Sequence, residues 1–310
     1  MENFLVCKGL SKKYKGSSYA LRNVSFGVPA KGIFALIGRN GAGKTTLVRI
    51  LATELMQTSG SASLNGFDTV KDAGAIREFI AIVPQESRLL GFMTPRQNII
   101  SYLMYRGFGH GEAKRRAAQA LKRSGINGFA DTQSMNLSGG TKRKALLATV
   151  MASEAGVLFL DEPTTGLDPI SRADVWRQLG ELKKDRFIFL TTHYLEEAEH
   201  LADTIGIVEK GRLVAIGSME QLRKSVGYDY TVKILQKGAR IGRYRGKTVR
   251  GLDGNVSIFT TNREANRLSN ALVKRNVRVS TTPISLEEIF YHKVRRSLAE
   301  DTEGEEKEWW

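Results

Sequence analysis

The sequence has almost no cysteine and no long apolar run. Its 310 residues include one cysteine, Cys7, so the chain cannot hold an internal disulfide, and we expect a reducing compartment. The longest nearly apolar stretch, residues 145–160, is interrupted by Ser153 and Glu154 and falls short of the roughly 18 apolar residues of a spanning helix. Residues 1–4 do not have the pattern of a signal peptide. If this protein works at a membrane, we expect another protein to cross it.

Acidic residues are scarce relative to basic ones. The 32 Asp and Glu against 47 Lys and Arg give a formal net charge of +15 and an isoelectric point of about 9.9. This excess predicts a polyanionic partner, and both an anionic membrane surface and nucleic acid fit it. A solvated basic surface with no such partner is an equally good interpretation. The hydrophobic content of 41% is enough for a packed core, and the length predicts two domains, or one large and one small.

Residues 38–46, which read G-R-N-G-A-G-K-T-T, fit the phosphate-binding pattern G-x-x-x-x-G-K-[ST]. The glycines let successive backbone N–H groups point toward phosphate oxygens, Lys44 adds a mobile positive charge, and the Thr45 hydroxyl can ligate a phosphate-bound Mg²⁺. An apolar run at 33–37 predicts a buried strand before the loop, and apolar residues at helical spacing follow it. The predicted nucleotide-binding residues of this loop are Gly38, Arg39, Asn40, Gly41, Ala42, Gly43, Lys44, Thr45 and Thr46.

Helical and strand patterns alternate after residue 137, which predicts an α/β fold with a mostly parallel sheet and helices on both faces. The predicted helices are 141–152, 171–183 and 194–202, and the predicted strands are 157–160, 187–190 and 205–208. Four apolar runs are each followed within three residues by a group that can do chemistry: the phosphate loop, Gln85, Asp161 with Glu162, and His193. Because ligands bind beyond the carboxyl ends of the strands in such sheets, we expect these groups to share one edge.

Changes in composition predict how the chain is divided. Residues 1–220 would form one domain, with antiparallel strands near its start, a turn that holds Tyr14, and an inserted helical lobe at about 86–136. Residues 228–298 carry fifteen Lys and Arg against five Asp and Glu and alternate in short segments, which predicts a small basic α+β domain. The acidic residues 299–310 predict a flexible tail.

Two further segments can act on a phosphate. Asp161, at the end of an apolar strand, can hold Mg²⁺ through water, and the adjacent Glu162 can polarise a water for in-line attack on a γ-phosphate. Two surface acids at a strand end are the alternative, which the upstream phosphate loop disfavours. Ser138 would cap a helix whose first residues, Gly139 and Gly140, expose backbone N–H groups to a second anion. A plain Ser-capped helix would show the same pattern.

The order and spacing of these motifs resemble an ATP-binding-cassette (ABC) nucleotide-binding domain. The resemblance covers about residues 1–220, and its motifs are the phosphate loop, Gln85, L-S-G-G at 137–140, D-E-P at 161–163, G-L-D at 166–168 and His193. It implies a P-loop NTPase core of the RecA-like type with an N-terminal antiparallel β subdomain, ATP hydrolysis as the activity, and ATP and Mg²⁺ as cofactors. The segments that resemble the ABC-2 type exporter branch, close to the lipid- and drug-exporting A subfamily, are 191–199, 211–218 and 282–290.

The resemblance also implies a role for each motif residue. Tyr14 would stack on adenine, although an ordinary turn tyrosine is the alternative. Glu162 would be the general base, and His193 would contact the γ-phosphate and order the attacking water. Gln85 would join the metal site and signal to the membrane partner. The implied Mg²⁺ ligands are Thr45, Gln85 and Asp161, and the implied catalytic residues are Glu162, His193 and Gln85.

A second subunit would complete the site. The resemblance implies a head-to-tail dimer in which Ser138, Gly139 and Gly140 touch the ATP held by the other protomer, and Asp168 lies at the dimer seam. The implied partners are a second copy of this chain, or a paralogous cassette, and a separate transmembrane permease subunit. The protein would then be peripheral, at the cytoplasmic face of the cell membrane. Residues 141–144, T-K-R-K, replace the glutamine-rich continuation of importers, which argues against an importer.

Two interpretations compete with an exporter subunit. A soluble ATPase of the same fold, acting on nucleic acid or ribosomes, would explain the basic C-terminal domain. Nucleic acid is nevertheless the disfavoured partner, because the chain has one cassette, no long coiled-coil insertion and no strong aromatic interleaving at 237–250. A carbohydrate-binding C-terminal module would need a larger β-sandwich than about 70 residues can form. Leu89, Leu90 and Phe92 are the expected docking surface for a membrane subunit, unless they pack inside the helical lobe.

Overall fold

The chain forms two compact units, Met1–Ile216 and Gly217–Trp310. The computed structural model describes residues 3–16, 18–86, 88–236, 244–250 and 256–294. The division between Ile216 and Gly217 falls a few residues before the boundary at residue 220 that composition indicates. The predicted acidic tail, residues 299–310, lies outside the described residues.

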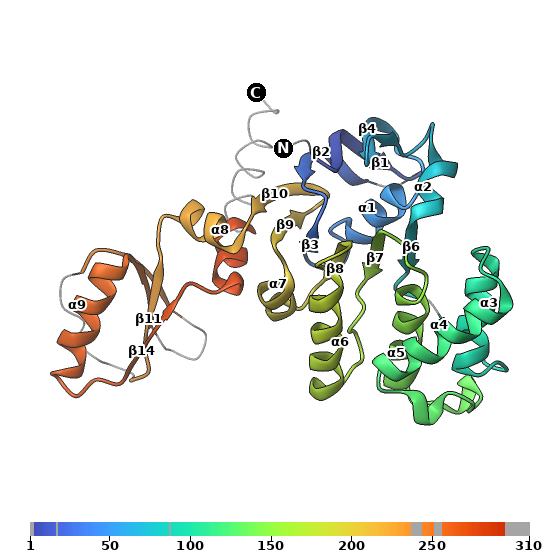
Figure 1. The fold of residues 1–310 in the computed structure, drawn as a ribbon. Coiled ribbons are helices and arrows are strands. Elements are labelled where there is room, and N and C mark those ends of the chain that lie inside the picture. The colour runs from blue at the N-terminus through green and yellow to red at the C-terminus, as the bar shows by residue number, and fades with distance from the viewer. Residues whose placement is uncertain (1–2, 17, 87, 237–243, 251–255, 295–310) are drawn as a thin grey trace. The chain divides into compact units, whose positions relative to one another are not determined.

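The first unit is built on a six-stranded sheet (Figure 1). Its strands are β3 (Gly32–Ile37), β6 (Ile80–Val83), β7 (Val157–Asp161), β8 (Phe187–Thr192), β9 (Thr204–Glu209) and β10 (Arg212–Gly217), in the order β10-β9-β3-β8-β7-β6. Strand β3 pairs in parallel with β8 and β9, and β7 pairs in parallel with β6 and β8. The middle strands are apolar and almost wholly buried, as parallel strands are when both faces are covered. The predicted α/β class is confirmed.

A smaller antiparallel sheet packs against the first. Its strands are β1 (Leu5–Lys13), β2 (Tyr19–Val28), β4 (Ser59–Leu64) and β5 (Phe67–Asp68), in the order β2-β1-β4-β5. Helix α1 (Lys44–Leu51) touches strands of both sheets, and its Leu47 shares one core with Phe34 and Leu64. The β4–β5 hairpin turns at Asn65 and Gly66, whose φ angles of 52° and 82° are the left-handed values that a type I′ turn requires.

The helical lobe is built from three helices of the described residues. They are α3 (Pro95–Tyr105), α4 (His110–Arg123) and α5 (Gly139–Met151), with short 3₁₀ turns at Asn127–Phe129 and Ser134–Asn136. A capping box fixes the start of α3, since Thr94 and Gln97 each accept a hydrogen bond from the other's backbone N–H. The lobe core joins Leu103 and Leu121 to Ala145 of α5. Because α5 also contacts β6, this helix links the lobe to the central sheet.

The remaining helices of the first unit complete its layers. They are α2 (Ala73–Phe79), α6 (Pro169–Leu182) and α7 (Leu195–Leu201). Helix α7 contacts β3, β8 and α6, on the side of the central sheet away from the antiparallel sheet (Figure 1). Helices α5, α6 and α7 each start and end within two residues of the predicted helices 141–152, 171–183 and 194–202. None of the helices in the described ranges has the length and apolar character of a bilayer-spanning segment.

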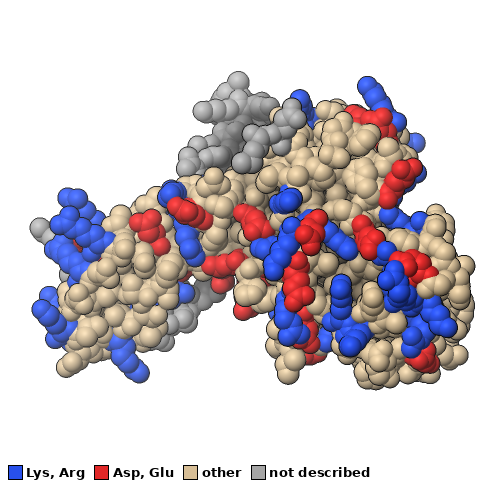
Figure 2. Space-filling model, in the orientation of Figure 1, with Lys and Arg blue, Asp and Glu red and all other residues tan. Residues whose placement is uncertain are grey.

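The second unit is a small α+β fold. It holds α8 (Met219–Val226), β11 (Tyr230–Ile234), β12 (Lys247–Arg250), β13 (Val256–Thr260), α9 (Asn262–Val273) and β14 (Val279–Pro283), with the strands in the order β12-β13-β11-β14. The paired strands are antiparallel, and α9 packs Leu268 and Leu272 onto Val232 and Ile258. Lys and Arg side chains gather on the part of this unit shown in Figure 2.

Candidate functional site

The phosphate loop connects β3 to α1 and depends on two of its glycines for packing. A Cβ atom on Gly38 would lie 2.4 Å from the carbonyl oxygen of Val208. One on Gly43 would lie 2.4 Å from the carbonyl oxygen of Ala20, and the φ of Gly43 is +106°. Gly41 also has a left-handed φ, +79°, but open space around it. The loop is therefore held against β9 on one side and β2 on the other, in a conformation that only glycine adopts without strain.

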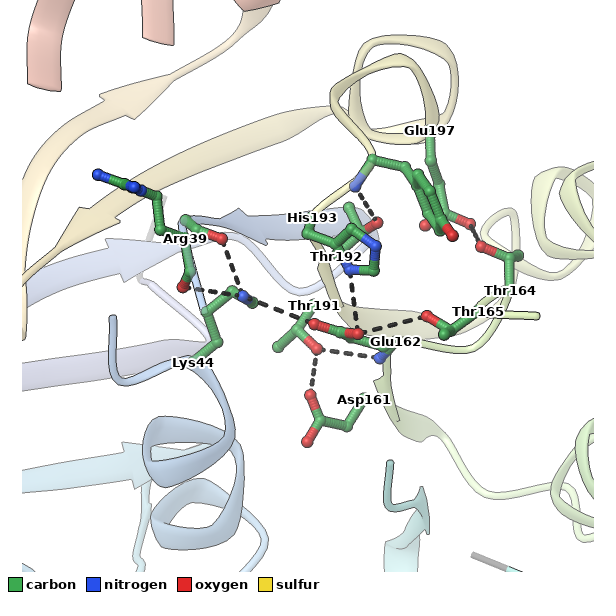
Figure 3. A network of polar contacts seen from close by, with 12 residues as sticks. Arg39, Lys44, Asp161, Glu162, Thr164, Thr165, Thr191, Thr192, His193 and Glu197 are labelled. Carbon is green, nitrogen blue, oxygen red and sulfur yellow. Dashed lines mark hydrogen bonds and ion pairs between the residues drawn. The ribbon is translucent and has the colours of Figure 1, made fainter. Parts of the chain in front are cut away.

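Lys44 reaches from the phosphate loop toward Glu162 (Figure 3). Its Nζ donates hydrogen bonds to the carbonyl oxygens of Gly38 at 2.8 Å and Arg39 at 3.3 Å, so the side chain folds back over its own loop. The same Nζ lies 3.6 Å from Oε1 of Glu162. The side chains of Lys44 and Glu162 are only 5% and 7% exposed, which makes this a buried ion pair. The loop lysine and the acid after β7 are thus brought together, although 118 positions apart in the numbering.

Glu162 has an unusual backbone and a fully engaged carboxylate. Its φ is +50°, a left-handed value that costs a non-glycine residue about 1–3 kcal/mol. Its N–H donates to both the carbonyl and the hydroxyl oxygen of Thr191, each at 3.1 Å. Oε2 lies 3.0 Å from Nδ1 of His193 and accepts a hydrogen bond from the Thr165 hydroxyl at 3.3 Å. Because a carboxylate only accepts, Nδ1 of His193 is the donor, and Glu162 bridges this histidine to Lys44.

Asp161 lies behind Glu162, at the last position of β7. Asp161 is 1% exposed, and its carboxylate accepts a hydrogen bond from the Thr191 hydroxyl (Figure 3). Thr191 therefore orients both acids: it accepts from the backbone of one and donates to the side chain of the other. The strand ends of β3, β7 and β8 meet here, as expected from the parallel sheet.

Comparison with known sequences identifies the family of this chain. The sequence profile of the ABC transporter family matches residues 21–165. Daunorubicin resistance ATP-binding protein DrrA3 of Streptomyces coeruleorubidus is 37% identical over 235 residues, which are 76% of this chain and 74% of that protein. The chain belongs to the ABC transporter family. It is an ATP-binding subunit and an ATPase of this family.

Further comparisons agree on the branch and the fold. ABC transporter A family member 7 of Dictyostelium discoideum is 37% identical over 234 residues, 75% of this chain but 28% of that longer protein. A solved ATP-binding subunit of an ABC transporter is 28% identical, with a TM-score of 0.66 over 72% of this chain and 93% of that one. The ATP-binding cassette MJ0796, solved as a dimer with ADP and Pi, is 23% identical with a TM-score of 0.64 over 69% and 98%, respectively. The predicted resemblance to A-subfamily cassettes and the P-loop NTPase fold are confirmed.

Two residues that the resemblance assigns to the site, Tyr14 and Gln85, lie outside the buried network. Tyr14 is 39% exposed, and its hydroxyl is 3.5 Å from Oγ1 of Thr46, at the start of α1. Gln85 is exposed in the turn after β6. Within the described residues no hydrogen bond joins Gln85 to Lys44, Asp161 or Glu162. Strands β7 and β8 lie between β6 and β3, which separates Gln85 from Lys44, whereas β6 pairs directly with β7, the strand that ends at Asp161.

The segment that the sequence predicts to bind a second anion forms the start of α5. Ser138 caps α5, with its hydroxyl oxygen accepting from the N–H of Thr141 at 3.2 Å, and the next residue, Gly139, is exposed with open space around it. Asp168 caps α6 by accepting from the N–H of Ser171 at 2.9 Å. Hydrogen bonds from Ser171 hold the pKa of Asp168 below its ordinary value. Among the described residues no hydrogen bond or ion pair connects these caps to Lys44.

Sequence reasoning missed a buried acid beside the site. Glu197 of α7 is fully buried, and its Oε1 accepts from the Thr164 hydroxyl at 2.8 Å and from Nε1 of Trp176 at 3.0 Å. Burial raises the pKa of Glu197 above its ordinary value. The contacts tie α7, which follows His193, to α6 and to the loop after β7. Glu196, Glu197 and Glu199 are close together in the sequence, and the sequence does not indicate that Glu197 is the one that is buried.

Proposed function

We propose that this chain is the ATP-hydrolysing subunit of an exporter, with Glu162 as the general base. The observation that carries the proposal is the position of the Glu162 carboxylate, 3.6 Å from Lys44 Nζ and 3.0 Å from His193 Nδ1. Lys44 is the expected partner of the outer phosphates, so a base that touches it lies beside the γ-phosphate. A water there can lose a proton to Glu162 as its oxygen attacks the γ-phosphorus and the bond to the ADP oxygen breaks.

His193 and Thr165 would orient the base. Each donates a hydrogen bond to Oε2 of Glu162, which restricts rotation of the carboxylate. With Nδ1 occupied, the second ring nitrogen of His193 is left to contact the γ-phosphate or the attacking water. Lys44 would neutralise charge that develops on the transferred phosphoryl oxygens.

A magnesium ion fits the oxygen ligands at hand. Mg²⁺ prefers carboxylate, hydroxyl and amide oxygens, which are the groups that Asp161, Thr45 and Gln85 offer. Bound there, Mg²⁺ would supply a positive charge that stabilises the β- and γ-phosphate oxygens. The buried Asp161 is oriented for this role by Thr191, whereas the exposed Gln85 would have to approach from the turn after β6.

The second anion-binding segment supports a head-to-tail dimer. Ser138 and Gly139 are exposed at the start of α5 and lack any bond to the phosphate loop of their own chain among the described residues. A second copy could present the same segment to the ATP held by Lys44, with Asp168 at the seam. Both half-sites are present in one sequence, so a homodimer is chemically sufficient.

The expected docking surface divides in two. Leu89 packs against the core of the helical lobe, while Leu90 and Phe92 are 50% and 64% exposed. We propose that Leu90 and Phe92 bind a separate membrane subunit, which would place this protein at the cytoplasmic face of the membrane. The relative named for daunorubicin resistance supports export over import.

Site-specific crosslinking tests this docking surface. A photo-reactive phenylalanine analogue in place of Phe92 is expected to crosslink in cells to an integral membrane protein. Tyr105, 89% exposed at the end of α3 in the same lobe, is the matched control position and is expected to give no such product. Crosslinks from Phe92 to ribosomal proteins or RNA would instead favour a soluble ATPase that acts on nucleic acid or ribosomes.

A further inference from the structure

Arg143 of α5 holds the backbone of the segment that carries the acids. Its Nε donates to the carbonyl oxygen of Pro163 at 2.9 Å. Its Nη2 donates to the carbonyl oxygens of Asp161 at 3.0 Å and Glu162 at 2.7 Å. One guanidinium therefore binds three successive carbonyl groups, at the point where β7 ends.

This arrangement is costly and specific. Burial lowers the pKa of the Arg143 guanidinium, and the nearby charges of Asp161, Glu162 and Glu197 act in the opposite direction. Removing a charge from water without a strong partner is unfavourable, so a half-buried arginine whose guanidinium donates to three backbone oxygens points to a positional requirement. The planar fork of an arginine can reach several carbonyl groups at once, which a lysine ammonium cannot do in the same geometry.

The peptide that Arg143 holds is the strained one. Glu162 is left-handed, and its N–H and carbonyl are both fixed: the N–H by Thr191 and the carbonyl by Arg143. If either anchor is lost, φ can relax to the ordinary right-handed or extended region. Such a rotation would move the carboxylate away from Lys44 and His193.

Arg143 also connects this peptide to a distant segment. It lies in α5, five residues after the cap Ser138, and the same helix contributes Ala145 and Ala148 to the lobe core. A shift of α5 along or about its axis would therefore pull directly on the carbonyl of Glu162.

We propose that Arg143 is a positioning residue, which keeps Glu162 in its left-handed conformation and passes movements of the α5 start to the base. This rests on the proposed role of Glu162. Arg143 is not itself catalytic, because its donors contact backbone carbonyls and none of the groups that face the γ-phosphate. The residue differs in this respect from Lys44, which has the same charge but lies at the phosphate loop.

Two substitutions and a matched control test the proposal. Arg143→Gln is expected to lower kcat by about 10²-fold, the cost of misplacing a catalytic group, with the KM for ATP unchanged. Arg143→Lys keeps the charge but loses the fork and is expected to lie between Arg143→Gln and the native protein. Arg186 is the control, since burial also lowers its pKa and it donates to the Met151 carbonyl at the other end of α5, at 3.1 Å. Arg186→Gln is expected to leave kcat unchanged.

Hydrogen exchange provides a readout that does not depend on turnover. Arg143→Gln is expected to speed amide exchange in the peptide that covers residues 161–165, and Arg186→Gln to leave it unchanged. Equal exchange there in native protein and Arg143→Gln would overturn the proposal. If Arg143→Gln does not fold, the same comparison is made with Arg143→Lys.

Measurements in the Glu162→Gln variant separate the proposed role of Arg143 from the assignment of Glu162 as the base. In Glu162→Gln, single-turnover hydrolysis with excess protein is expected to be no slower when Arg143→Gln is added. A further loss of about 10²-fold in that background would show that Arg143 does not act through Glu162. If Glu162→Gln alone hydrolyses ATP at the native rate, the base is wrongly assigned, and the exchange experiment still tests whether Arg143 fixes the Glu162 peptide.

Discussion

Lys44 Nζ and Glu162 Oε1 are 3.6 Å apart, and both side chains are almost fully buried. A buried charge that loses its partner is strongly destabilising, whereas the loss of both partners together costs much less. The two residues that the proposed mechanism places beside the γ-phosphate are therefore also coupled through the stability of the protein.

The coupling can be measured with a double-mutant cycle. Lys44→Met is expected to abolish ATP binding and to lower the free energy of unfolding, because the Glu162 carboxylate keeps only His193 and Thr165. Glu162→Gln on top of Lys44→Met is expected to recover part of that loss, with a coupling of about 1–3 kcal/mol. Thermal or urea unfolding of the native protein, both single variants and the double variant gives the value. Strictly additive effects would show that the pair contributes nothing to stability.

The glycines of the chain differ in what an alanine would do. Gly38→Ala is expected to destabilise the protein by about 1–3 kcal/mol and to weaken ATP binding, because the new Cβ would lie 2.4 Å from the Val208 carbonyl oxygen. Gly111 of α4 has open space around it, so Gly111→Ala is expected to stabilise by about 0.5–1 kcal/mol. Unfolding midpoints of the two variants that move in the same direction would contradict this account of the loop.

Glu197 predicts a pH dependence of stability. Its folded-state pKa is raised, so between the ordinary value of about 4.3 and that higher value the folded protein binds more protons than the unfolded chain. Stability from this group therefore falls as pH rises through the folded pKa and is recovered as pH falls. Glu197→Gln keeps an acceptor for Thr164 and Trp176 without the charge. The variant is expected to gain stability relative to the native protein at pH 7 and to lose that advantage near pH 4.

Comparing the native protein with the Glu197→Gln variant isolates the effect of Glu197 on the pH dependence of stability. Asp68, Asp131 and Asp168 have lowered pKa values, so their contributions to stability are lost on acidification in both proteins alike. Unfolding midpoints measured from pH 4 to 8 give the difference. A difference that is constant across this range would mean that Glu197 does not titrate differently in the folded state.

Short-range sequence patterns were enough to predict the strands of the central sheet and the phosphate loop. The glycine spacing, Lys44 and the apolar runs depend on neighbours in the chain, and the rule that ligands lie beyond strand ends brought Glu162 and His193 to the same edge as Lys44. What the pattern could not provide was the order of the strands. Gln85 follows a strand end like the others, but β6 is the outermost strand on its side, and its turn is exposed.

The other residues that the sequence did not predict correctly depend on contacts with segments far away in the chain. Arg143 reads as a surface residue in T-K-R-K until the packing of α5 places its guanidinium on three carbonyls after β7. Glu197 is one of several acids on α7, and only contacts with α6 and the loop after β7 show that it faces inward. Leu89 and Leu90 lie in a loop without periodicity, so their separate environments follow from tertiary packing alone.

The account depends most on Glu162 as the general base. Glu162→Gln preserves the shape of the side chain and removes its basicity, so we expect ATP to bind with native affinity while hydrolysis falls by about 10²–10⁴-fold. The stalled protein is also expected to accumulate as an ATP-dependent dimer. The most direct measurement is the rate of phosphate release at saturating ATP and Mg²⁺, with ATP affinity measured in parallel. A large loss of rate at unchanged affinity is the predicted result, and release at the native rate would contradict the assignment.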